Sequence, residues 1–276
     1  MARAKAKKKK KKGAKRQESW RETFKTVFWA VVIALLVRTF AYEPFSIPSG
    51  SMLPGLLVGD YLFVSKFSYG YTRYSFPWSP RLFSGRILDG TPERGDVVVF
   101  RLPADTKVDY IKRVIGLPGD KIQVKDGRLY INGKIVERRR AGQRVENERD
   151  EETGRWGETL YQIYTETLPN GRSYRIYEQS DAYPGSDNTP EYTVPASQYF
   201  MMGDNRDNSC DSRFSASYNP GGAGPRCRQV VGYVPFANLI GRAEFIFFSG
   251  DGSAEIWEVW RWPFAIRFNR FLKGVR

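Results

Sequence analysis

The chain has 276 residues, 41% of them apolar and 15% aromatic, so it can bury a folded core and does not belong to the intrinsically disordered class. Its formal net charge is +14, but ten of the 44 Lys and Arg residues stand in the first sixteen positions, which leaves only +4 for the rest. The basic charge is therefore a tail and not a folded nucleic-acid-binding face. The absence of histidine excludes a Ser-His-Asp triad and His-based zinc sites.

An apolar segment follows the basic tail. Residues 24–42, FKTVFWAVVIALLVRTFAY, would make a helix about 28 Å long against a hydrocarbon core of about 30 Å. We predict a retained transmembrane helix, with the tail of residues 1–23 in the cytoplasm and everything after Tyr42 on the extracytoplasmic side. A cleaved secretion signal and a buried core helix are the alternatives. The cleaved signal is disfavoured because Tyr42, Glu43 and Pro44 do not form a small-residue cleavage site.

Residues 43–260 are predicted to form a mainly β domain, because the apolar segments are short, alternating and separated by turns. The pairs Asp126-Gly127 and Asn132-Gly133 favour tight hairpins, since glycine accepts a positive φ. The middle of the chain should therefore be an antiparallel meander. The expected strands are YLFVSKF (61–67), DVVVFRL (96–102), DKIQVKDGRLYINGKIV (120–136), YFMMGD (199–204) and AEFIFF (243–248).

Two further segments are expected to stand apart from this sheet. Residues 137–195 are predicted to be an inserted second β subdomain with loops, in which the charged residues 137–158 form a solvated excursion that buries little. The last segment, residues 261–276, is predicted to be a basic amphipathic helix that begins at Pro263. This helix would lie in the membrane interface or pack on its own domain, and both readings stay open.

The two cysteines of the chain are Cys210 and Cys227. If the predicted topology holds, both lie in a compartment that permits disulfides. We favour a bridge between them, which would stabilise the fold by roughly 3 kcal/mol in the chain-entropy model. The alternative is two unpaired thiols.

A stretch of three serine hydroxyls raises the question of a nucleophile. The stretch is EPFSIPSGSMLPGLLVGD, residues 43–60, and without histidine the remaining activator of a serine is a lysine amine that is neutral at the working pH. No S-x-x-K or G-x-S-x-G motif is present. On pattern alone, Pro48-Ser49-Gly50-Ser51 is more often a rigid loop than a nucleophile.

The best candidate for the base is Lys112 in VDYIKRVIGLPGD, because burial among apolar neighbours on a strand lowers a lysine pKa by up to ~3 to 5 units. Lys66 in VSKFSYG is the second candidate for the base. Strand alternation places Tyr110 and Lys112 on one face and Ile111 and Arg113 on the other. The competing interpretation is a lysine that reaches solvent from a sheet edge.

Several separated blocks resemble bacterial type I signal peptidase, the family of membrane-bound Ser/Lys proteases that remove signal peptides from exported proteins. The resemblance covers most of residues 24–248 and follows an N-terminal apolar helix. The blocks are IPSGSMLPGLLVGD, then GDVVVF with DYIKRVIGLPGD, and finally YFMMGDNRDNSCDSR with GYVPFANLIGRA. Their joint order makes the resemblance highly specific.

This resemblance implies Ser51 as the nucleophile and Lys112 as the general base. It also implies an oxyanion hole made by the backbone N–H of Ser51 and the hydroxyl of Ser49. The reaction implied is hydrolysis of a peptide bond through a Ser51 acyl-enzyme.

The same comparison implies supporting roles in GDNRDNSCDSR. Ser209 would hydrogen-bond the lysine amine and orient it, while Asp211 and Arg213 would pair and hold the loop. This chain departs from the family pattern where Cys210 stands inside the motif and RFSASYNPGGAGPRCRQV intervenes before the next block. The departure bears on the loop geometry and not on the dyad.

The resemblance further implies shallow apolar subsites for an extended peptide with small residues before the cut. The candidate subsite residues are Phe45, Ile47, Pro48, Tyr110 and Ile111. We expect signal-peptide-bearing preproteins and the lipid bilayer as partners, no metal or other cofactor, no nucleic acid, and a monomer. The expected location is the bacterial inner membrane, single-pass, with the catalytic domain on the periplasmic side.

Two other function classes remain open. A non-catalytic extracytoplasmic scaffold would capture extended peptides by strand addition, without turnover. Alternatively, the Lys-rich tail would be an arm for nucleic acid or anionic lipid, and its deletion would abolish function. A related self-cleaving Ser/Lys regulator is disfavoured, because nothing ahead of the dyad resembles a DNA-reading domain.

Overall fold

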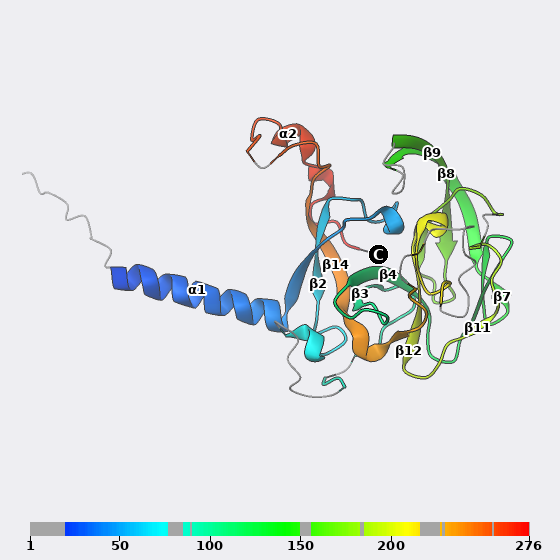
Figure 1. The fold of residues 1–276 in the computed structure, drawn as a ribbon, viewed down its shortest axis with the longest axis horizontal. Helices are drawn as coiled ribbons and strands as arrows, with labels where there is room; N and C mark the ends of the chain where they lie inside the picture. Colours follow the sequence, from blue (N-terminus) through cyan, green and yellow to red (C-terminus); the bar gives the residue numbers. More distant parts are fainter. Residues whose placement is uncertain are drawn as a thin grey trace, which may run out of the picture.

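The computed structural model describes one long N-terminal helix that projects from a β body (Figure 1). The predicted cytoplasmic tail up to residue 19, and most of the segment between the two cysteines, lie outside the described residues. The described residues are 20–76, 85–88, 90–149, 156–182, 185–215, 227, 230–255 and 257–275.

Helix α1 (Trp20–Phe40) is exposed along its length, and Thr39 is its one buried residue. Within the part of the chain that the structure describes, it is the one helix long and apolar enough, by length and composition, to cross a membrane. It begins four residues before the predicted segment and ends at Phe40, because Tyr42 already pairs with the second strand. The hydroxyl of Tyr71 donates to the Phe40 carbonyl (2.7 Å) and fastens the helix to the body.

The main sheet has seven strands, all paired antiparallel, which confirms the predicted fold class. Each strand expected for this sheet is present, with ends that differ by a few residues from the prediction. In spatial order the strands are β1 (Tyr42–Ser46), β2 (Asp60–Ser65), β14 (Leu239–Ser249), β3 (Val97–Arg101), β4 (Asp109–Gly116), β12 (Gln198–Met202) and β13 (Val234–Pro235).

A four-stranded sheet forms the predicted meander in the middle of the chain. Its turns carry positive φ at Asp126, Gly127, Asn132 and Gly133, as tight hairpins require. The strands in spatial order are β11 (Tyr192–Thr193), β5 (Lys121–Lys125), β6 (Arg128–Ile131) and β7 (Lys134–Ile135).

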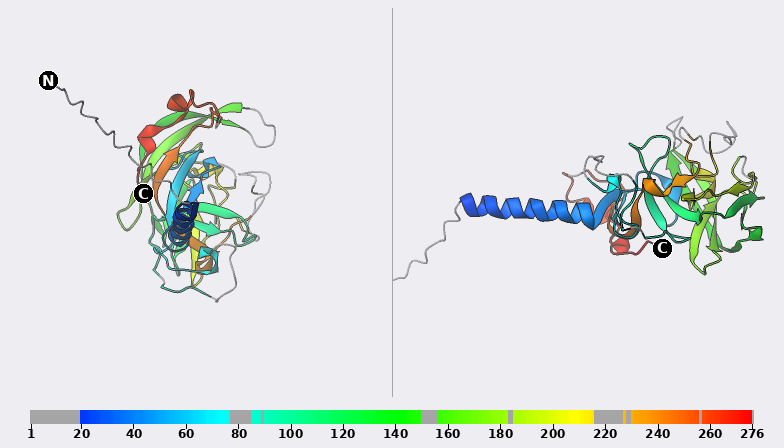
Figure 2. Two further views of the ribbon diagram at one scale, coloured as in Figure 1. Left: turned by 90° about the vertical axis from the view of Figure 1, so that its left-hand side faces the viewer. Right: turned by 90° about the horizontal axis from the view of Figure 1, so that it is seen from below.

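A third sheet of three strands forms a long ribbon beside the meander (Figures 1 and 2). Its spatial order is β10 (Ser173–Glu178), β9 (Trp156–Thr167) and β8 (Glu137–Arg149). The charged segment predicted to be a solvated excursion is therefore a strand, paired with β9 from Glu137 to Arg149. Its low burial was predicted correctly, but an exposed strand keeps its regular backbone because cross-strand hydrogen bonds need no buried side chains.

The C-terminal segment contradicts the prediction of one amphipathic helix over residues 261–276. Helix α2 covers only Trp262–Ala265, and a single 3-10 turn, η5, covers Phe268–Arg270. Pro263 stands in the first turn as expected. The later apolar residues have a helical spacing in the sequence, but they do not lie in an α-helix.

Contacts with the main sheet explain this difference. Beyond η5 the backbone bonds to β14, with the N–H of Leu272 donating to the carbonyl of Ile246 (2.7 Å). Arg270 is buried and forms an ion pair with the buried Asp60 (2.5 Å). A continued helix would have left both the β14 edge and Asp60 without these partners.

The segment after β1 is fixed by apolar anchors. Ile47, Met52 and Leu56 are buried in one cluster with Val97 and Val99 of β3. The serines between these anchors stay partly exposed. Packing therefore holds the backbone of this segment while leaving its hydroxyls accessible.

Candidate active site

The predicted nucleophile stands on a short turn at the surface of the main sheet. A 3-10 turn, η1 (Gly50–Met52), carries Ser51, and Ser49 precedes it in an extended conformation. The two hydroxyl oxygens are 3.4 Å apart. The structure thus brings together the two serines that were predicted to act on one substrate carbonyl.

Lys112 reaches this turn from the neighbouring strand β4. Its Nζ lies 2.6 Å from the Ser51 Oγ and donates to the carbonyl of Ile111 (3.0 Å). The Tyr110 ring centroid is 5.4 Å from the same nitrogen, in keeping with the predicted shared face. The lysine side chain is 3% exposed, although the serine is partly open to solvent.

Burial lowers the pKa of the Lys112 amine to about 8, because the charged form loses its hydration. The carboxylates of Asp211 and Asp204 oppose this shift, and the positive charge of Arg213 adds to it. The amine is therefore poised to accept a proton near neutral pH.

The second candidate base, Lys66, is engaged elsewhere. Its amine forms an ion pair with Glu43 (2.9 Å) and donates to the carbonyl of Ser75 (2.6 Å). Burial lowers the pKa of Lys66, but the carboxylate of Glu43 acts in the opposite direction. An amine held by a carboxylate is a poor proton acceptor, so the geometry favours Lys112 over Lys66.

Asp211 and Arg213 form a buried ion pair with an N–O distance of 2.9 Å. Asp211 also accepts from the backbone N–H of Gly203 (3.0 Å), and Arg213 donates to the carbonyl of Arg206 (2.5 Å). The pair therefore ties both sides of the loop together, as the resemblance implied. Burial alone would raise the pKa of Asp211, but Arg213 and the donated hydrogen bonds hold it below its usual value.

Ser209 does not make the predicted bond to the lysine amine in this structure. Its hydroxyl is buried and has no hydrogen-bond partner among the described residues. It lies close behind the nucleophile, since a Cβ at Gly203 would stand 2.1 Å from the Ser209 Oγ and 2.5 Å from the Ser51 carbonyl oxygen. Its predicted role stays a prediction.

The structure joins the neighbouring Cys210 to Cys227 in a disulfide, with a Cα–Cα distance of 5.4 Å. This is the favoured of the two arrangements considered from the sequence. The bridge attaches the inserted segment directly beside Ser209 and Asp211.

Sequence reasoning missed two contacts of the GDN part of the loop. Asp204 forms a bidentate ion pair with Arg113, at 2.8 and 2.6 Å. Asn205 binds the nucleophile turn through the carbonyls of Ser51 and Gly50. Alternation placed Arg113 on the face opposite Lys112, but it indicated neither the burial of this side chain nor its partner.

The predicted subsite residues fall into two groups. Phe45, Ile47 and Ile111 pack against one apolar cluster, and Phe45 and Ile111 are half-buried. Tyr110 packs instead against a different cluster, and Pro48 is exposed. The structure thus brings three of the five together.

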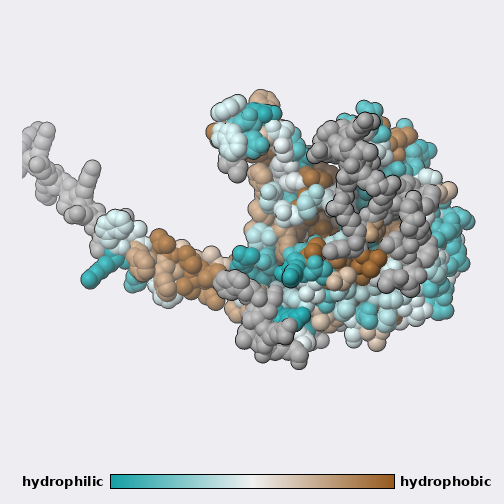
Figure 3. Space-filling view, in the orientation of Figure 1, coloured by the Kyte–Doolittle hydropathy of each residue, from teal (hydrophilic) through white to brown (hydrophobic). Residues whose placement is uncertain are grey.

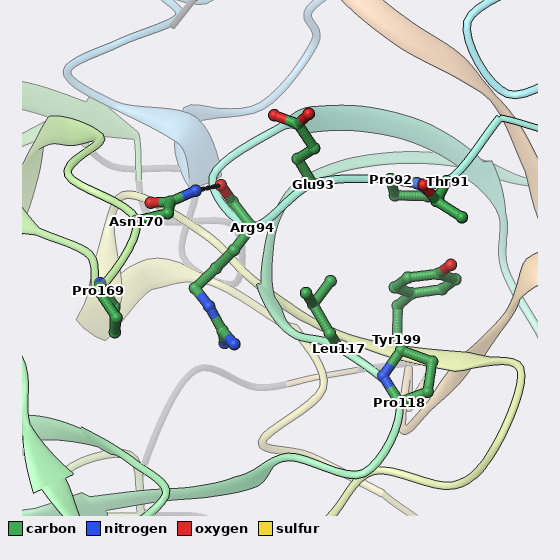
Figure 4. A pocket seen from close by; sticks show the side chains of 9 residues that line it. All are labelled: Thr91, Pro92, Glu93, Arg94, Leu117, Pro118, Pro169, Asn170 and Tyr199. Atoms are coloured by element: carbon green, nitrogen blue, oxygen red, sulfur yellow. Dashed lines mark hydrogen bonds between the residues drawn. The ribbon is translucent and has the colours of Figure 1, made fainter.

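A surface cavity of about 690 Å³ lies elsewhere on the body (Figure 4). The hydrogen bond from the Asn170 amide to the Arg94 carbonyl (2.7 Å) closes one side. None of the predicted site residues lines it. The lining residues are Thr91, Pro92, Glu93, Arg94, Leu117, Pro118, Pro169, Asn170 and Tyr199. Over the described residues, no group of three or more His, Cys, Asp or Glu side chains is placed to hold a metal ion.

Comparison with known proteins identifies the family of the chain. Residues 20–248 match the family described as signal peptidase, peptidase S26. Signal peptidase I of Rickettsia typhi is 43% identical over 246 residues, which cover 85% of this chain and 83% of that protein. Signal peptidase I of Rickettsia canadensis is 45% identical over 239 residues, covering 83% of this chain and 80% of that protein.

A crystal structure of a signal peptidase I from Enterococcus faecalis V583 is 23% identical, with a TM-score of 0.29. The match covers 55% of this chain and 96% of that chain. The family match and the two rickettsial relatives extend over most of the sequence. The chain therefore belongs to the signal peptidase family, peptidase S26, and is a protease of the signal peptidase I type.

Proposed function

We propose that this protease removes signal peptides from exported preproteins with Ser51 as the nucleophile and Lys112 as the general base. The observation that carries the proposal is the 2.6 Å contact between the Lys112 Nζ and the Ser51 Oγ, made by a buried amine. A pKa of about 8 leaves roughly one amine in ten neutral at pH 7, compared with less than about one in a thousand for an ordinary lysine.

The reaction proceeds in two halves. The neutral amine takes the Ser51 proton as Oγ attacks the scissile carbonyl carbon, and the resulting ammonium gives that proton to the departing amine when the C–N bond breaks. The amine then takes a proton from water, which attacks the ester and releases the new carboxyl terminus. The proton returns to the Ser51 Oγ.

The negative oxygen of each tetrahedral intermediate is held by the Ser51 backbone N–H and the Ser49 hydroxyl. Donors fixed at this position stabilise the transition state by roughly 3 to 4 kcal/mol each. The 3.4 Å between the two serine oxygens supports their action on one substrate oxygen. The Asp211–Arg213 pair keeps the loop in place, and the proposed role of Ser209 in orienting the lysine amine requires a hydrogen bond that is not present among the described residues of this structure.

The substrate lies extended along the partly exposed apolar side chains beside the turn. The half-buried Phe45 and Ile111 form the shallow subsites, which suit small side chains before the cut, and the buried Ile47 packs in the same cluster. Tyr110 and Pro48 would contact the peptide from other sides of the turn.

The protein works at a membrane. Helix α1 is the span, and its exposed apolar surface is visible as the brown band in Figure 3. Residues 1–23 stay in the cytoplasm, which places the β body on the periplasmic side. The C-terminal part of the chain carries exposed aromatic side chains that suit the lipid interface, on Trp257, Trp260 and Phe264. That the protein acts as a monomer stays a prediction.

Purified full-length protein in detergent micelles tests the proposal with one signal-peptide-bearing preprotein and mass analysis of the products. Ser51→Ala and Lys112→Met should each abolish cleavage. Lys112→Arg should fail too, because a guanidinium cannot accept the proton. Lys107→Met, at an exposed turn, is the matched control and should cleave normally. Normal cleavage by Ser51→Ala or Lys112→Met would refute the proposal, and binding without turnover by the parent protein would favour a peptide-capturing scaffold.

A further inference from the structure

We propose that Asn205 is a positioning residue that sets the direction of the Ser51 backbone N–H, the oxyanion donor. This inference rests on the proposed function. It concerns a side chain that touches neither Lys112 nor the Ser51 hydroxyl in the described contacts, and it follows from two hydrogen bonds to successive peptide groups.

Asn205 holds both peptide groups that flank the nucleophile. Its side-chain Nδ2 donates to the carbonyl of Gly50 (3.2 Å), and its backbone N–H donates to the carbonyl of Ser51 (3.1 Å). The first carbonyl belongs to the peptide group before the Ser51 Cα, and the second belongs to the one after it. Asn205 therefore contacts the backbone on both sides of the Ser51 Cα, and the turn itself adds one hydrogen bond to the Gly50 carbonyl, from the Leu53 N–H (3.1 Å).

Because the peptide group is planar, the hydrogen bond to the Gly50 carbonyl also acts on the direction of the Ser51 N–H, the oxyanion donor. The carbonyl of Gly50 and the N–H of Ser51 are parts of one planar, trans peptide group, so they point in opposite directions. Holding the Gly50 oxygen from the loop side makes the Ser51 N–H point away from the loop. A hydrogen bond received by the carbonyl also polarises the group and strengthens its N–H as a donor.

Asn205 is itself held by rigid elements, so it can position the turn and need not follow it. The N–H of Tyr177 in β10 donates to the carbonyl of Asp204 (2.9 Å), and Tyr177 forms a parallel β-bridge with Asn205. The Asp204 side chain is clamped by Arg113 of β4, the residue next to the base. The loop residues Asp204 and Asn205 are thus hydrogen-bonded to both the three-stranded ribbon and the main sheet.

The chemistry of the side chain matters as well as its size. Asn205 is buried, and its Oδ1 has no partner among the described residues, whereas its Nδ2 is used. An unsatisfied buried acceptor is unfavourable. The amide is nevertheless placed with its donor on the Gly50 carbonyl. An Asp at this position would present carboxylate oxygens to the Gly50 carbonyl and repel it.

The inference predicts a specific kinetic signature. Losing an oxyanion donor outright costs about 100- to 1000-fold in kcat. Asn205→Ala keeps the Ser51 N–H but leaves the Gly50 carbonyl with one of its two hydrogen bonds, from the Leu53 N–H, so the direction of the Ser51 N–H is less fixed and kcat should fall by about 10- to 100-fold. KM should stay within about twofold, because the donor acts on charge that develops only in the transition state. Asn205→Asp should lose more activity than Asn205→Ala.

The experiment uses full-length protein in detergent and measures kcat, KM and pH profile on one preprotein. Inhibition by a substrate-like peptide aldehyde is measured beside it, because its tetrahedral adduct carries an oxyanion. We expect the aldehyde Ki to rise by about the same factor as kcat falls, with the midpoint of the pH profile unchanged near 8. Asn208→Ala, three residues further along and solvent-exposed, is the control and should keep the parent kcat.

An Asn205→Ala kcat within twofold of the parent, a change confined to KM, or a shifted pH midpoint would overturn the inference. Circular dichroism and tryptophan fluorescence spectra of each variant check that it is folded. If Asn205→Ala does not fold, Asn205→Ser carries the same predictions. Failure of the proposed function is separate: it shows as activity in Lys112→Met, whereas failure of this inference shows as an inactive Lys112→Met beside a fully active Asn205→Ala.

Discussion

Replacing Lys112, the proposed general base, by methionine should make the protein more stable while it abolishes activity. In the folded chain the pKa of Lys112 is lowered from 10.5 to about 8 by burial, so folding penalises the charged amine. Methionine fills a similar volume without a charge. Lys112→Met therefore removes a penalty that the parent protein carries whenever the amine is protonated.

The size of the effect follows from the difference in pKa between the unfolded and folded states. The fall of about 2.5 units from 10.5 to about 8, at ~1.36 kcal/mol per unit, corresponds to roughly 3 kcal/mol. Between pH 8 and 10.5 the unfolded parent binds more protons, so its stability rises with pH in that window. Lys112→Met should gain up to ~3 kcal/mol below pH 8, less about 1 kcal/mol for the lost hydrogen bond to Ser51, and above pH 10.5 only that loss of about 1 kcal/mol should remain.

Urea unfolding in detergent micelles, followed by tryptophan fluorescence at pH 6.5, 8 and 10.5, measures this difference. The exposed variant Lys107→Met controls for the loss of a positive charge and should show no pH-dependent gain. A Lys112→Met variant that is less stable than the parent at pH 6.5, or a difference that does not change with pH, would refute the reasoning.

Three further outcomes follow from the site. The kcat/KM of the parent should rise about tenfold per pH unit below pH 8 and level off above it, because the free amine is the active form. Gly203→Ala should abolish cleavage, measured on the preprotein, because its Cβ would stand 2.1 Å from the Ser209 Oγ and 2.5 Å from the backbone carbonyl oxygen of Ser51. Asp204→Asn should lower the free energy of unfolding by about 3 to 5 kcal/mol, measured with urea at pH 7, because it leaves the buried Arg113 without its charged partner.

The pairing of serine and lysine was accessible from the sequence because it follows from residue chemistry. A chain without histidine leaves a buried lysine as the activator, and the alternation around Lys112 placed it on a strand among apolar residues. The family resemblance then selected Ser51. These two residues are 61 positions apart, and the structure brings their reactive atoms to 2.6 Å.

The contacts that hold the loop and the nucleophile turn around this pair could not be predicted from the sequence. The Asn205–Gly50 and Arg113–Asp204 contacts join positions 155 and 91 residues apart, and single-residue patterns carry no information about such partners. An alternating strand places Arg113 on the face opposite Lys112, but it shows neither that this side chain is buried nor which carboxylate neutralises it. Only the folded loop shows that Asn205 grips the backbone of the nucleophile turn.

The C-terminal segment shows how tertiary contacts override local periodicity. The sequence after Pro263 has the spacing of an amphipathic helix, yet the ion pair of Arg270 with Asp60 and the backbone bonds to β14 shorten the helix to one turn. Isolated short helices are only marginally stable in water, so a few tertiary bonds are enough to replace one.

The central claim is tested most directly by the pKa of the Lys112 amine in the intact protein. Full-length protein labelled with ¹⁵N-lysine and titrated in micelles would report it through the Nζ signal that is missing in Lys112→Met. The account predicts a midpoint near pH 8. A midpoint close to the ordinary lysine value, about 10.4, would mean that the amine stays protonated at neutral pH and would contradict its role as the base.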